Sequence, residues 1–423
     1  MSARTLDQWL AYQLRVHPHE IELGLERVRE VWQRMGAPRA PVNLIVGGTN
    51  GKGSTVAFLV AMLRAAGHRV GAYTSPHLLR YNERVHIDGE DADDASLCDA
   101  FERIEKARLD TELTYFEFGT LAALDLFARA GVNVAVIEVG LGGRLDASNI
   151  VDADAGIVTT VDLDHQAWLG SDRDTIGVEK AGIARADRPL IIGESDPPRG
   201  LLDALQRIGA AVQRAGVDYH VRQHESGWTW MHRDGTRLEL PDAVLDAPAQ
   251  VANAAAAVAA LHALQDRMDC PASALAEGVR TARLQGRLQR FPGTPERVLD
   301  VAHNPQAARM LASWLDEHPV RGPIHAVFGA LEDKDVAGIC SALAGRITHW
   351  HLAGLESESP RGLPARSLAF GFPDSTPYTL HTDVLSALDA AEWAVPQRIL
   401  IFGSFFVVAA VLRSMNGSVH GIP

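Results

Sequence analysis

A glycine-rich stretch with one lysine, GGTNGKGST at residues 47–55, contains the residue types that bind phosphate groups. In such a turn the backbone N–H groups point at an anion, the lysine adds positive charge, and a hydroxyl can reach a bound magnesium ion. The stretch departs from the usual phosphate-loop pattern G-x-x-x-x-G-K-[ST], because Gly53 separates Lys52 from Ser54. Taken alone, it is about equally consistent with a nucleotide loop and with an incidental glycine turn.

Acidic residues follow two further apolar runs. Glu138 stands near the end of the run at 132–140, and the run at 155–163 leads into Asp164 and His165. Acids at the carboxyl ends of parallel strands can hold the magnesium ion of a nucleotide. Because magnesium prefers oxygen ligands, the residue types alone favour a hydrogen-bonded histidine at the rim of the site over a metal ligand at His165.

Strands and helices are expected to alternate around these residues. Residues 41–46 have the apolar run of a buried strand that leads into the glycine loop, and residues 54–67 have the apolar spacing of a helix. Continuous apolar strands that alternate with helices predict a mostly parallel, doubly wound sheet. This strand–loop–helix setting favours ATP binding over the incidental turn.

The chain is expected to be an α/β protein of two domains. Polar and apolar residues alternate from 215 to 246, which predicts a small β element. Glycine, proline and charge then come together at 285–296, and the strand–helix alternation restarts after them. We therefore expect an N-terminal P-loop-type ATPase domain with a mostly parallel sheet at residues 1–286, and a smaller C-terminal Rossmann-like α/β domain at 287–423.

Composition excludes several other classes of protein. The 423 residues carry a formal net charge of −13, which argues against a nucleic-acid surface. Cys98, Cys270 and Cys340 lie far apart and do not suggest a disulfide framework. The most apolar run, at 399–412, is shorter than the ~20 residues that span a bilayer. A cytoplasmic monomer without a nucleic-acid or membrane partner is expected.

Characteristic sequence blocks occur along nearly the whole chain. In order, they are HPHEIELGLERV, VGGTNGKGST, TSPHLLRYNERVHIDG, TYFEFGTLAAL, IEVGLGGRLDASN, DHQAWLG, IGVEKAGI, QGRLQ, LDVAHNP, GALEDKD and FGSFFVVAAVL. Together they resemble the folylpolyglutamate synthases, whose bacterial form is the bifunctional dihydrofolate synthase/folylpolyglutamate synthase of the Mur-type ATP-dependent amide ligase superfamily. In this family the extra glycine belongs to the phosphate loop.

The resemblance implies a role for residues in each matching block. ATP would be bound by Asn50, Gly51, Lys52, Gly53, Ser54, Asn253, Arg287 and Asp300. Magnesium, at two sites, would be held by Ser75, Glu138 and His165. The pterin segments would be Thr114, Tyr115, Phe116 and Glu117 with Leu145, Asp146 and Ala147. Lys52, Glu138, His165 and Lys180 would be the catalytic group, with Lys180 carbamylated to help hold the second magnesium ion.

The activity implied is ATP-dependent ligation of L-glutamate to dihydropteroate and to reduced folates through an acyl phosphate. Two departures from the family pattern stand out: Ala167 replaces an acid before WLG, and residues 360–365 lack the usual arginine-rich character. Three alternatives remain: a monofunctional folylpolyglutamate synthase, another Mur-type ligase, and a nucleotide-binding protein without chemistry. Mur-type ligases of UDP-sugar peptides are disfavoured, because they carry an additional N-terminal domain and the phosphate loop begins here by residue 47.

Overall fold

The structure is a computed structural model, and it describes residues 4–17, 22–243, 245, 247–373 and 375–419. Residues 18–21, part of the block HPHEIELGLERV, lie outside the described residues. The chain forms two compact units, Met1–Val244 with Gln250–Arg283 and Leu245–Ala249 with Leu284–Pro423. Each unit contains its own predominantly parallel sheet with helices, which confirms the predicted α/β fold class.

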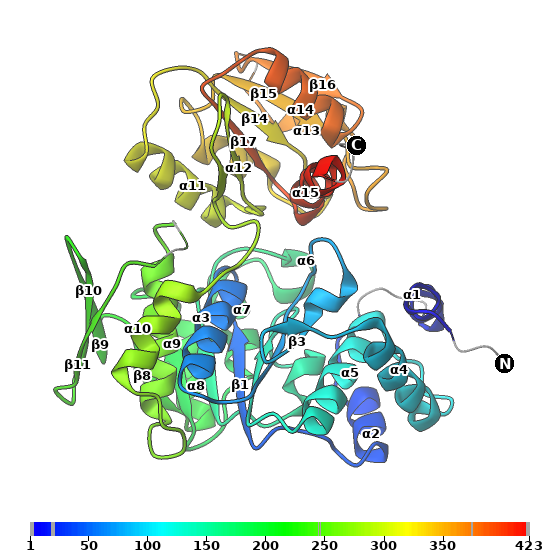
Figure 1. Ribbon diagram of the computed structural model, residues 1–423, viewed down its shortest axis with the longest axis vertical. Helices are drawn as coiled ribbons and strands as arrows, with labels where there is room; N and C mark the ends of the chain where they lie inside the picture. The colour runs from blue at the N-terminus through cyan, green and yellow to red at the C-terminus, as the bar shows by residue number, and fades with distance from the viewer. Residues whose placement is uncertain (1–3, 18–21, 244, 246, 374, 420–423) are drawn as a thin grey trace. The chain divides into compact units, whose positions relative to one another are not determined.

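The described strands of the first unit form an eight-stranded, mostly parallel sheet (Figure 1). In spatial order they are β4 (Glu90–Asp91), β3 (Val85–Ile87), β2 (Val70–Tyr73), β5 (Val134–Glu138), β1 (Val42–Gly47), β6 (Ala155–Val158), β7 (Pro189–Ile192) and β8 (Ala211–Arg214). Every residue of β1, β2, β5 and β6 is buried. Burial on both faces explains why these strands form unbroken, mainly apolar runs in the sequence.

The register of the sheet brings the strand ends together. β1 lies between β5 and β6, with Val46 opposite Glu138 on one side and Ile157 on the other. On its other side β5 pairs in parallel with β2. The loops that leave β1, β2, β5 and β6 therefore start at the same edge of the sheet, which is where open α/β sheets bind ligands.

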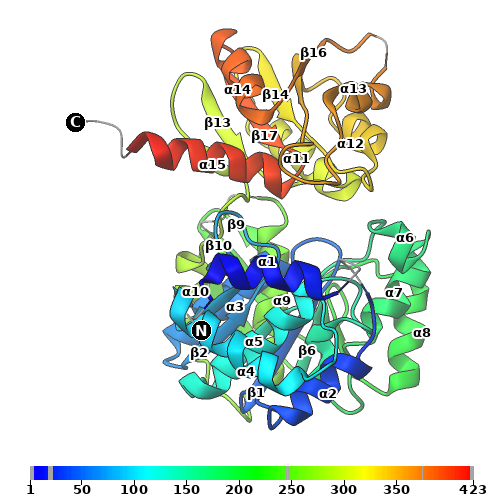
Figure 2. The same ribbon diagram turned by 90° about the vertical axis from the view of Figure 1, so that its right-hand side faces the viewer.

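Helices cover both faces of this sheet (Figure 2). The helices of this unit are α1 (Leu6–Val16), α2 (Glu26–Arg34), α3 (Lys52–Ala65), α4 (Asp94–Arg108), α5 (Tyr115–Ala130), α6 (Gln166–Leu169), α7 (Arg173–Ala181), α8 (Arg199–Ile208), α9 (Gln250–Ala263) and α10 (Ala272–Thr281), with 3-10 turns η1 (Tyr81–Arg84) and η2 (Ala147–Ile150). α3 packs against α9 and α10, α7 against α8, and α4 against α1 and α5.

Small residues let α3 pack closely against its neighbours. A Cβ atom at Gly278 of α10 would lie 2.5 Å from the Met62 backbone of α3, so the two helices meet without a side chain between them. α9 presents the buried alanines of the run Ala254–Ala257. Since tightly packed interiors resist displacement, the helix that follows the glycine loop is held rigidly on the sheet.

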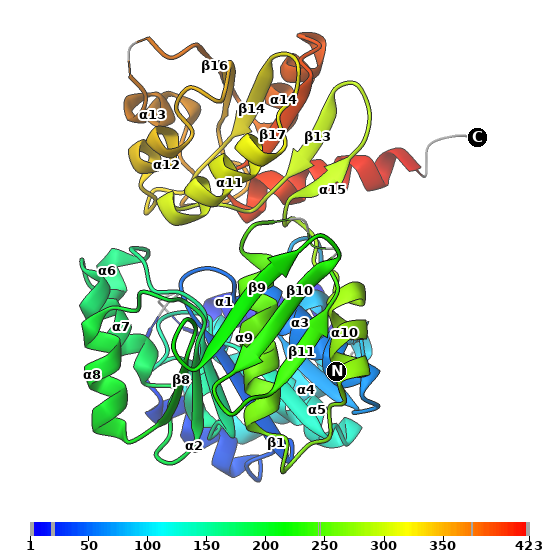
Figure 3. The same ribbon diagram turned by 90° about the vertical axis from the view of Figure 1, so that its left-hand side faces the viewer.

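A separate three-stranded antiparallel sheet occupies residues 219–240 of the first unit. It consists of β9 (Tyr219–His224), β10 (Gly227–His232) and β11 (Arg237–Leu240), and it lies beside α9 and α10 (Figure 3). The small β element expected at 215–246 is thus present. Trp228 and Trp230 of the central strand β10 are fully buried, whereas β9 beyond Tyr219 is exposed.

The described strands of the second unit form a six-stranded sheet that is parallel except at β12. In spatial order they are β12 (Gln289–Phe291), β13 (Glu296–Leu299), β17 (Arg398–Phe402), β14 (Ile324–Phe328), β15 (His349–Ala353) and β16 (Tyr378–His381). The helices are α11 (Pro305–Glu317), α12 (Val336–Ala342), α13 (Ala365–Leu368), α14 (Val384–Trp393) and α15 (Phe405–Val419), with a 3-10 turn η3 (Ala369–Gly371). None of the helices in the described part of the chain is long and apolar enough to cross a membrane.

Four histidines lie side by side on β14, β15 and β16. His325 Nδ1 lies 3.1 Å from His351 Nε2, and His351 Nδ1 lies 3.3 Å from His381 Nε2. The ring of His349 is 4.8 Å from that of His351. Burial lowers the pKa of all four rings, and for His351 the neighbouring rings add to burial and bring the pKa to about 3. The folded sheet therefore favours neutral imidazoles.

Lowering the pH from about 7.5 to about 5.5 is expected to destabilise the second unit. These histidines have pKa values near 6.5 when unfolded, so in this window the unfolded chain binds more protons than the folded one. The stability that these neutral histidines contribute is fully present above about pH 6.5 and is lost as the pH falls towards the folded pKa values. The free energy of unfolding falls by about 1.4 kcal/mol per pH unit for each histidine that is protonated in the unfolded chain but not in the folded one. Calorimetry at both pH values measures the drop in thermal midpoint.

His351→Asn is the matched variant for this prediction. It should lower the thermal midpoint at about pH 7.5, because a packed ring is lost. The further drop on going to about pH 5.5 should be smaller, because asparagine does not bind a proton in the unfolded chain. The same drop in the variant as in the unaltered protein would contradict the assignment to this histidine row.

Candidate active site

The glycine loop joins β1 to α3 in a backbone path that only glycine allows at two positions. Gly51 caps the N-terminus of α3 with φ 87°, in the left-handed region. Gly48 has φ 145°, and a Cβ atom there would lie 1.8 Å from Thr159 Oγ1. The backbone N–H groups at the start of α3 therefore lie at the edge of the sheet formed by the strand ends, where they can donate hydrogen bonds to an anion.

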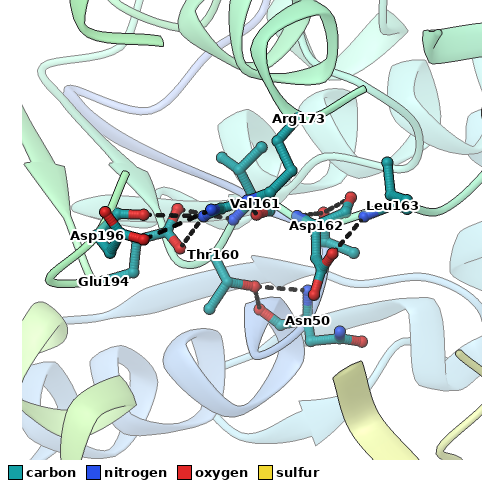
Figure 4. A network of polar contacts seen from close by, with 9 residues as sticks. Asn50, Thr160, Val161, Asp162, Leu163, Arg173, Glu194 and Asp196 are labelled. Carbon is teal, nitrogen blue, oxygen red and sulfur yellow. Dashed lines mark hydrogen bonds and ion pairs between the residues drawn. The ribbon is translucent and has the colours of Figure 1, made fainter. Parts of the chain in front are cut away.

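Hydrogen bonds from the segment after β6 hold this loop in place (Figure 4). Asn50 N–H donates to Thr160 Oγ1 at 3.1 Å, and Thr159 Oγ1 donates to Asn50 O at 2.6 Å. Thr49 Oγ1 donates to Asp162 O and accepts from Asp162 N–H, both at 3.0 Å. The sequence analysis did not assign the two threonines a role. Their signal was a pair of hydroxyl residues directly after a buried strand.

Lys52 lies across the loop that precedes it. Its Nζ donates to Gly48 O at 3.0 Å and to Thr49 O at 3.2 Å. These carbonyls hold the ammonium group against the loop. Gly53 follows in the first turn of α3, so the family's extra glycine lies within the helix.

Ser54 and Asn253 meet at the start of α3, although nearly two hundred residues separate them in the sequence. The buried Ser54 Oγ accepts a hydrogen bond from Gln250 Nε2 at 3.2 Å, and Gln250 Oε1 accepts one from Asn253 Nδ2 at 3.2 Å. A Cβ atom at Gly51 would lie 2.5 Å from Asn253 Oδ1. The structure thus brings Asn253 against the glycine loop, and Gln250 joins it as a residue that the sequence analysis did not select.

Glu138 and Ser75 lie at neighbouring strand ends. Glu138 is the last residue of β5 and is 5% exposed. Its Oε2 accepts a hydrogen bond from Ser75 N–H at 3.2 Å. Ser75 follows β2, the strand next to β5. The Glu138 carboxylate therefore lies against the Ser75 backbone, and the two residues offer a carboxylate and a hydroxyl as possible oxygen ligands at this end of the sheet.

His165 lies in the segment that also supports the glycine loop. It caps α6 with φ 48°, and its backbone N–H donates to Asp164 Oδ1 at 2.9 Å. Its Nε2 lies 4.0 Å from the same carboxylate oxygen. Ala167, where the family pattern has an acid, is exposed on α6.

Lys180 is buried in the first unit and is 3% exposed. It lies on α7, which packs against the loop after β5, where a Cβ atom at Gly143 would lie 3.0 Å from Glu179 O. Burial, with the positive charge of Lys52, lowers the pKa of Lys180 to about 7. A generic lysine on a helix would be solvated, and only packing reveals that this one is not.

Glu194 is a further, partly buried acid that the sequence analysis did not select. It follows β7, and its Oε1 accepts Val161 N–H at 2.9 Å while Oε2 accepts Arg173 Nη2 at 3.1 Å (Figure 4). Burial raises the pKa of Glu194 to about 7, although Arg173 acts in the opposite direction. The available signal was an acid shortly after the apolar residues of β7, at the carboxyl end of a strand.

The first expected pterin segment begins α5. Thr114 is the N-cap, its hydroxyl accepts Glu117 N–H at 3.3 Å, and Glu117 Oε2 accepts Thr114 N–H at 2.8 Å. The buried Glu117 carboxylate also pairs with Arg27, whose Nε lies 2.9 Å from Oε1. Tyr115 packs edge-on against Tyr81 with ring centroids 5.5 Å apart. Glu117 thus orders the segment by capping and by ion pairing.

The second expected pterin segment meets the first at Gly140. A Cβ atom there would lie 2.6 Å from Phe116 Cζ and 3.2 Å from Asp146 Oδ2. Asp146 is buried, and burial raises its pKa. Its Oδ2 accepts Leu141 N–H at 2.8 Å and its Oδ1 accepts Ser148 N–H at 3.0 Å. Asp146 therefore holds its own loop, with Leu145 and Ala147 on either side of it in the sequence.

Arg287 and Asp300 belong to the second unit. Asp300 accepts Leu288 N–H at 2.8 Å and Ala302 N–H at 2.7 Å, and burial raises its pKa. The Arg287 guanidinium lies 5.4 Å from the ring centre of Phe405. Asp300 thereby positions the backbone next to Arg287. In residues 360–365, the segment that departs from the family pattern, Gly362 forms an isolated β-bridge with Leu331.

Comparisons with known proteins match both units. The family described as "Mur ligase, glutamate ligase domain" matches residues 286–405. The dihydrofolate synthase/folylpolyglutamate synthase of Escherichia coli (strain K12) is 42% identical over 423 residues, which is 99% of this chain and 98% of that protein.

Solved structures give the same result. E. coli FolC in complex with DHPP and ADP has a TM-score of 0.93 and 42% identity, with 99% of both chains covered. A bifunctional folylpolyglutamate synthase/dihydrofolate synthase with Mn, AMPPNP and L-glutamate bound has a TM-score of 0.90 and 42% identity, with 98% of both chains covered. These likenesses confirm the resemblance drawn from the sequence blocks, and the chain belongs to the dihydrofolate synthase/folylpolyglutamate synthase family.

Proposed function

We propose that this protein uses ATP to join L-glutamate to dihydropteroate, giving dihydrofolate, and to tetrahydrofolate and its polyglutamates. The observation that carries this proposal is the full-length likeness to relatives whose structures hold DHPP with ADP, or AMPPNP with L-glutamate. The glycine loop, Glu138 and Lys180 in the first unit support it, because phosphoryl transfer needs an anion cradle and positive charge in a dry setting.

The reaction must activate a carboxylate, because its leaving group would otherwise be oxide. Transfer of the ATP γ-phosphoryl group to that carboxylate forms an acyl phosphate and releases ADP. The α-amino group of glutamate then attacks the acyl carbon, the C–O bond to phosphate breaks, and the nitrogen loses a proton to give the amide. Water must be excluded, because the acyl phosphate hydrolyses readily.

In this proposal the glycine loop binds the ATP phosphates. Backbone N–H groups from Asn50 to Ser54 would contact phosphate oxygens, and Lys52 would exchange its bonds to loop carbonyls for bonds to phosphate. Asn253, beside Gly51, would contact the nucleotide. Arg287 and Asp300 of the second unit are assigned to ATP by family resemblance. The positive end of α3 and the Lys52 charge would stabilise the charge of the transferring phosphoryl group.

Ser75, Glu138 and His165 fit a divalent cation. They offer a hydroxyl oxygen, a buried carboxylate and an imidazole, and a buried carboxylate is stabilised by a nearby positive charge. Manganese in a relative's structure supports the same class of ion. A magnesium ion held there would neutralise negative charge on the phosphate oxygens.

Lys180 is proposed to carry a carbamate. A pKa of about 7 leaves a substantial fraction of its amine neutral at neutral pH. A neutral amine attacks carbon dioxide, an N–C bond forms, one proton is lost, and a carbamate anion results. That anion would supply oxygen donors for a second magnesium ion.

Glu138→Gln is expected to lower turnover by at least ~10²-fold while the protein remains folded, because a charged oxygen donor is lost and the shape is kept. Phosphate release at limiting magnesium measures the effect, with circular dichroism as the folding check. The exposed Glu225→Gln is the control and should behave as the unaltered protein does. Near-normal turnover of Glu138→Gln would rule out this role for Glu138.

Lys180→Ala should lose ligase activity, and small carboxylic acids should restore part of it by occupying the place of the carbamate. Lys106→Ala, on the exposed side of α4, is the matched control and should keep full activity. Mass spectrometry of trapped carbamate gives a second readout. Full activity of the unaltered protein in a bicarbonate-free preparation, with no carbamate trapped, would count against the modification.

One catalytic centre is proposed to perform both glutamylations. The sequence has one phosphate loop and no duplicated segment. Dihydropteroate presents an aryl carboxylate, whereas a folate presents the γ-carboxylate of its glutamate tail, several ångströms further from the pterin. The same centre can serve both only if the pterin ring binds in two positions. Phe116 and Asp146, which meet at Gly140, are assigned to the dihydropteroate position.

Lys52→Ala is expected to abolish both activities together, whereas Phe116→Leu should depress dihydropteroate glutamylation roughly tenfold more than tetrahydrofolate glutamylation, because an aromatic contact is lost. Asp146→Ala is less informative, since it also removes the bonds that hold its loop. ADP release with dihydropteroate plus glutamate, and with tetrahydrofolate plus glutamate, measures both rates. The exposed Phe370→Leu is the control.

Each outcome of that assay separates the alternatives. Protein that extends tetrahydrofolate but never uses dihydropteroate would be a monofunctional folylpolyglutamate synthase. ATP binding without phosphate release under any substrate pair would identify a nucleotide-binding protein without this chemistry. Equal loss of both activities in Phe116→Leu would refute the two positions of the pterin and leave the shared centre intact.

A further inference from the structure

Two histidines and an aspartate meet where the three-stranded sheet lies beside α9 (Figure 3). His232 ends β10, Asp234 lies in the turn between β10 and β11, and His262 lies in the last turn of α9. One donor atom from each residue lies within 4.8 Å of the others. We call this group the hairpin triad. It has no part in the proposed ligase chemistry.

One carboxylate oxygen of the triad faces both imidazoles. Asp234 Oδ2 lies 2.9 Å from His262 Nε2 and 3.0 Å from His232 Nδ1. The other oxygen, Oδ1, accepts Thr236 N–H at 2.8 Å, and Gly235 continues the turn with φ 96°. The turn therefore fixes the direction of the carboxylate before any ligand arrives.

Aromatic packing holds the two imidazole rings. The Trp230 ring lies parallel to the His232 ring, at an interplanar angle of 3°, and meets the His262 ring edge-on at 5.3 Å. The side chains of His232 and His262 are 7% and 11% exposed, whereas that of Asp234 is 44% exposed. The triad is thus buried on its histidine side and open to solvent at the carboxylate, which leaves room for a water ligand.

The charges around the triad favour a cation. A carboxylate is ionised near neutral pH, and the C-terminal end of α9 carries the negative end of the helix dipole. The nearest arginine in the sequence, Arg233, is directed to Asp218, with Nη1 2.6 Å from Oδ1. These features place negative charge beside the two imidazole nitrogens.

We propose that His232, Asp234 and His262 bind a divalent transition-metal ion of the zinc class. Zinc bonds of 2.0–2.1 Å in a tetrahedral arrangement place donor atoms about 3.3 Å apart. The Asp234 oxygen lies 2.9 and 3.0 Å from the two imidazole nitrogens, close to that spacing, and all three donor atoms lie within 4.8 Å of one another. Two imidazoles and one carboxylate are typical zinc ligands, whereas magnesium and calcium prefer oxygen donors throughout.

The ion would join the β10–β11 turn to the helix that supports the glycine loop. Gln250 and Asn253 lie at the start of α9, and His262 lies nine residues beyond Asn253, about 13 Å along the helix. The site is therefore structural, separate from the ligands assigned to magnesium, and it clamps α9 at the end opposite the glycine loop.

Zinc content of the full-length protein tests the proposal. Chelator-treated protein is dialysed against Zn²⁺ with excess Mg²⁺, and bound zinc is measured by mass spectrometry. His262→Gln and Asp234→Asn should each bind one zinc ion per chain fewer than the unaltered protein. His220→Gln replaces an exposed histidine of the same small sheet and should lose none. Any zinc bound through His165 is common to all four proteins and cancels in the comparison.

Two further readouts keep the test decisive. Zn²⁺ should raise the thermal midpoint of the unaltered protein and of His220→Gln by at least about 2 °C more than that of the triad variants. Asp234→Asn retains the shape and the acceptor for Thr236 N–H, so it is expected to fold, and circular dichroism checks this. Folded triad variants that bind as much zinc as the unaltered protein would overturn the proposal. The triad would then only join the β10–β11 turn to α9 by hydrogen bonds.

Discussion

The close approach of the glycine loop to its neighbours is the constraint on which the first unit depends. No Cβ atom fits at Gly48 beside Thr159 or at Gly51 beside Asn253. The chain can follow this path only with glycine, and the path leaves the N–H groups at the start of α3 facing outward. Hydrogen bonds from Thr159 and Thr160 satisfy the loop's own polar groups. An anion cradle is therefore built into the backbone before a nucleotide binds.

Near this loop, the folded sheet and its helices bury charged groups, which costs free energy because the groups lose water. Burial raises the pKa of Glu194 and lowers that of Lys180, so each group is brought towards neutrality by the same loss of water. Lys52 adds to the effect on Lys180 because two like charges lie near each other. The same dry setting strengthens any interaction with a phosphate or a divalent ion. Burial of these charged groups costs folding stability at the same place where a strong electrostatic field would act on a bound phosphate.

Several residues selected for ligand binding also hold the backbone. Glu117 caps α5 and pairs with Arg27, and Asp146 receives N–H groups from two sides of its own loop. Their carboxylates order the segments that meet at Gly140, so a ligand there meets a preformed surface. α9 likewise contacts two regions. Its first turn contacts Ser54 at the glycine loop, and its last turn carries His262 of the hairpin triad.

The α/β class and the glycine loop could be read from the sequence, because apolar runs, helical spacing and glycine clusters are local patterns. The family blocks added the expected roles of the site residues, which local patterns alone do not predict. The shifted pKa values of Lys180 and Glu194 depend on burial, which arises when α7 and the strand ends pack. His232, Asp234 and His262 meet only after the hairpin folds against α9. No local pattern encodes such contacts, because they depend on which surfaces pack together, and packing is settled by the whole chain.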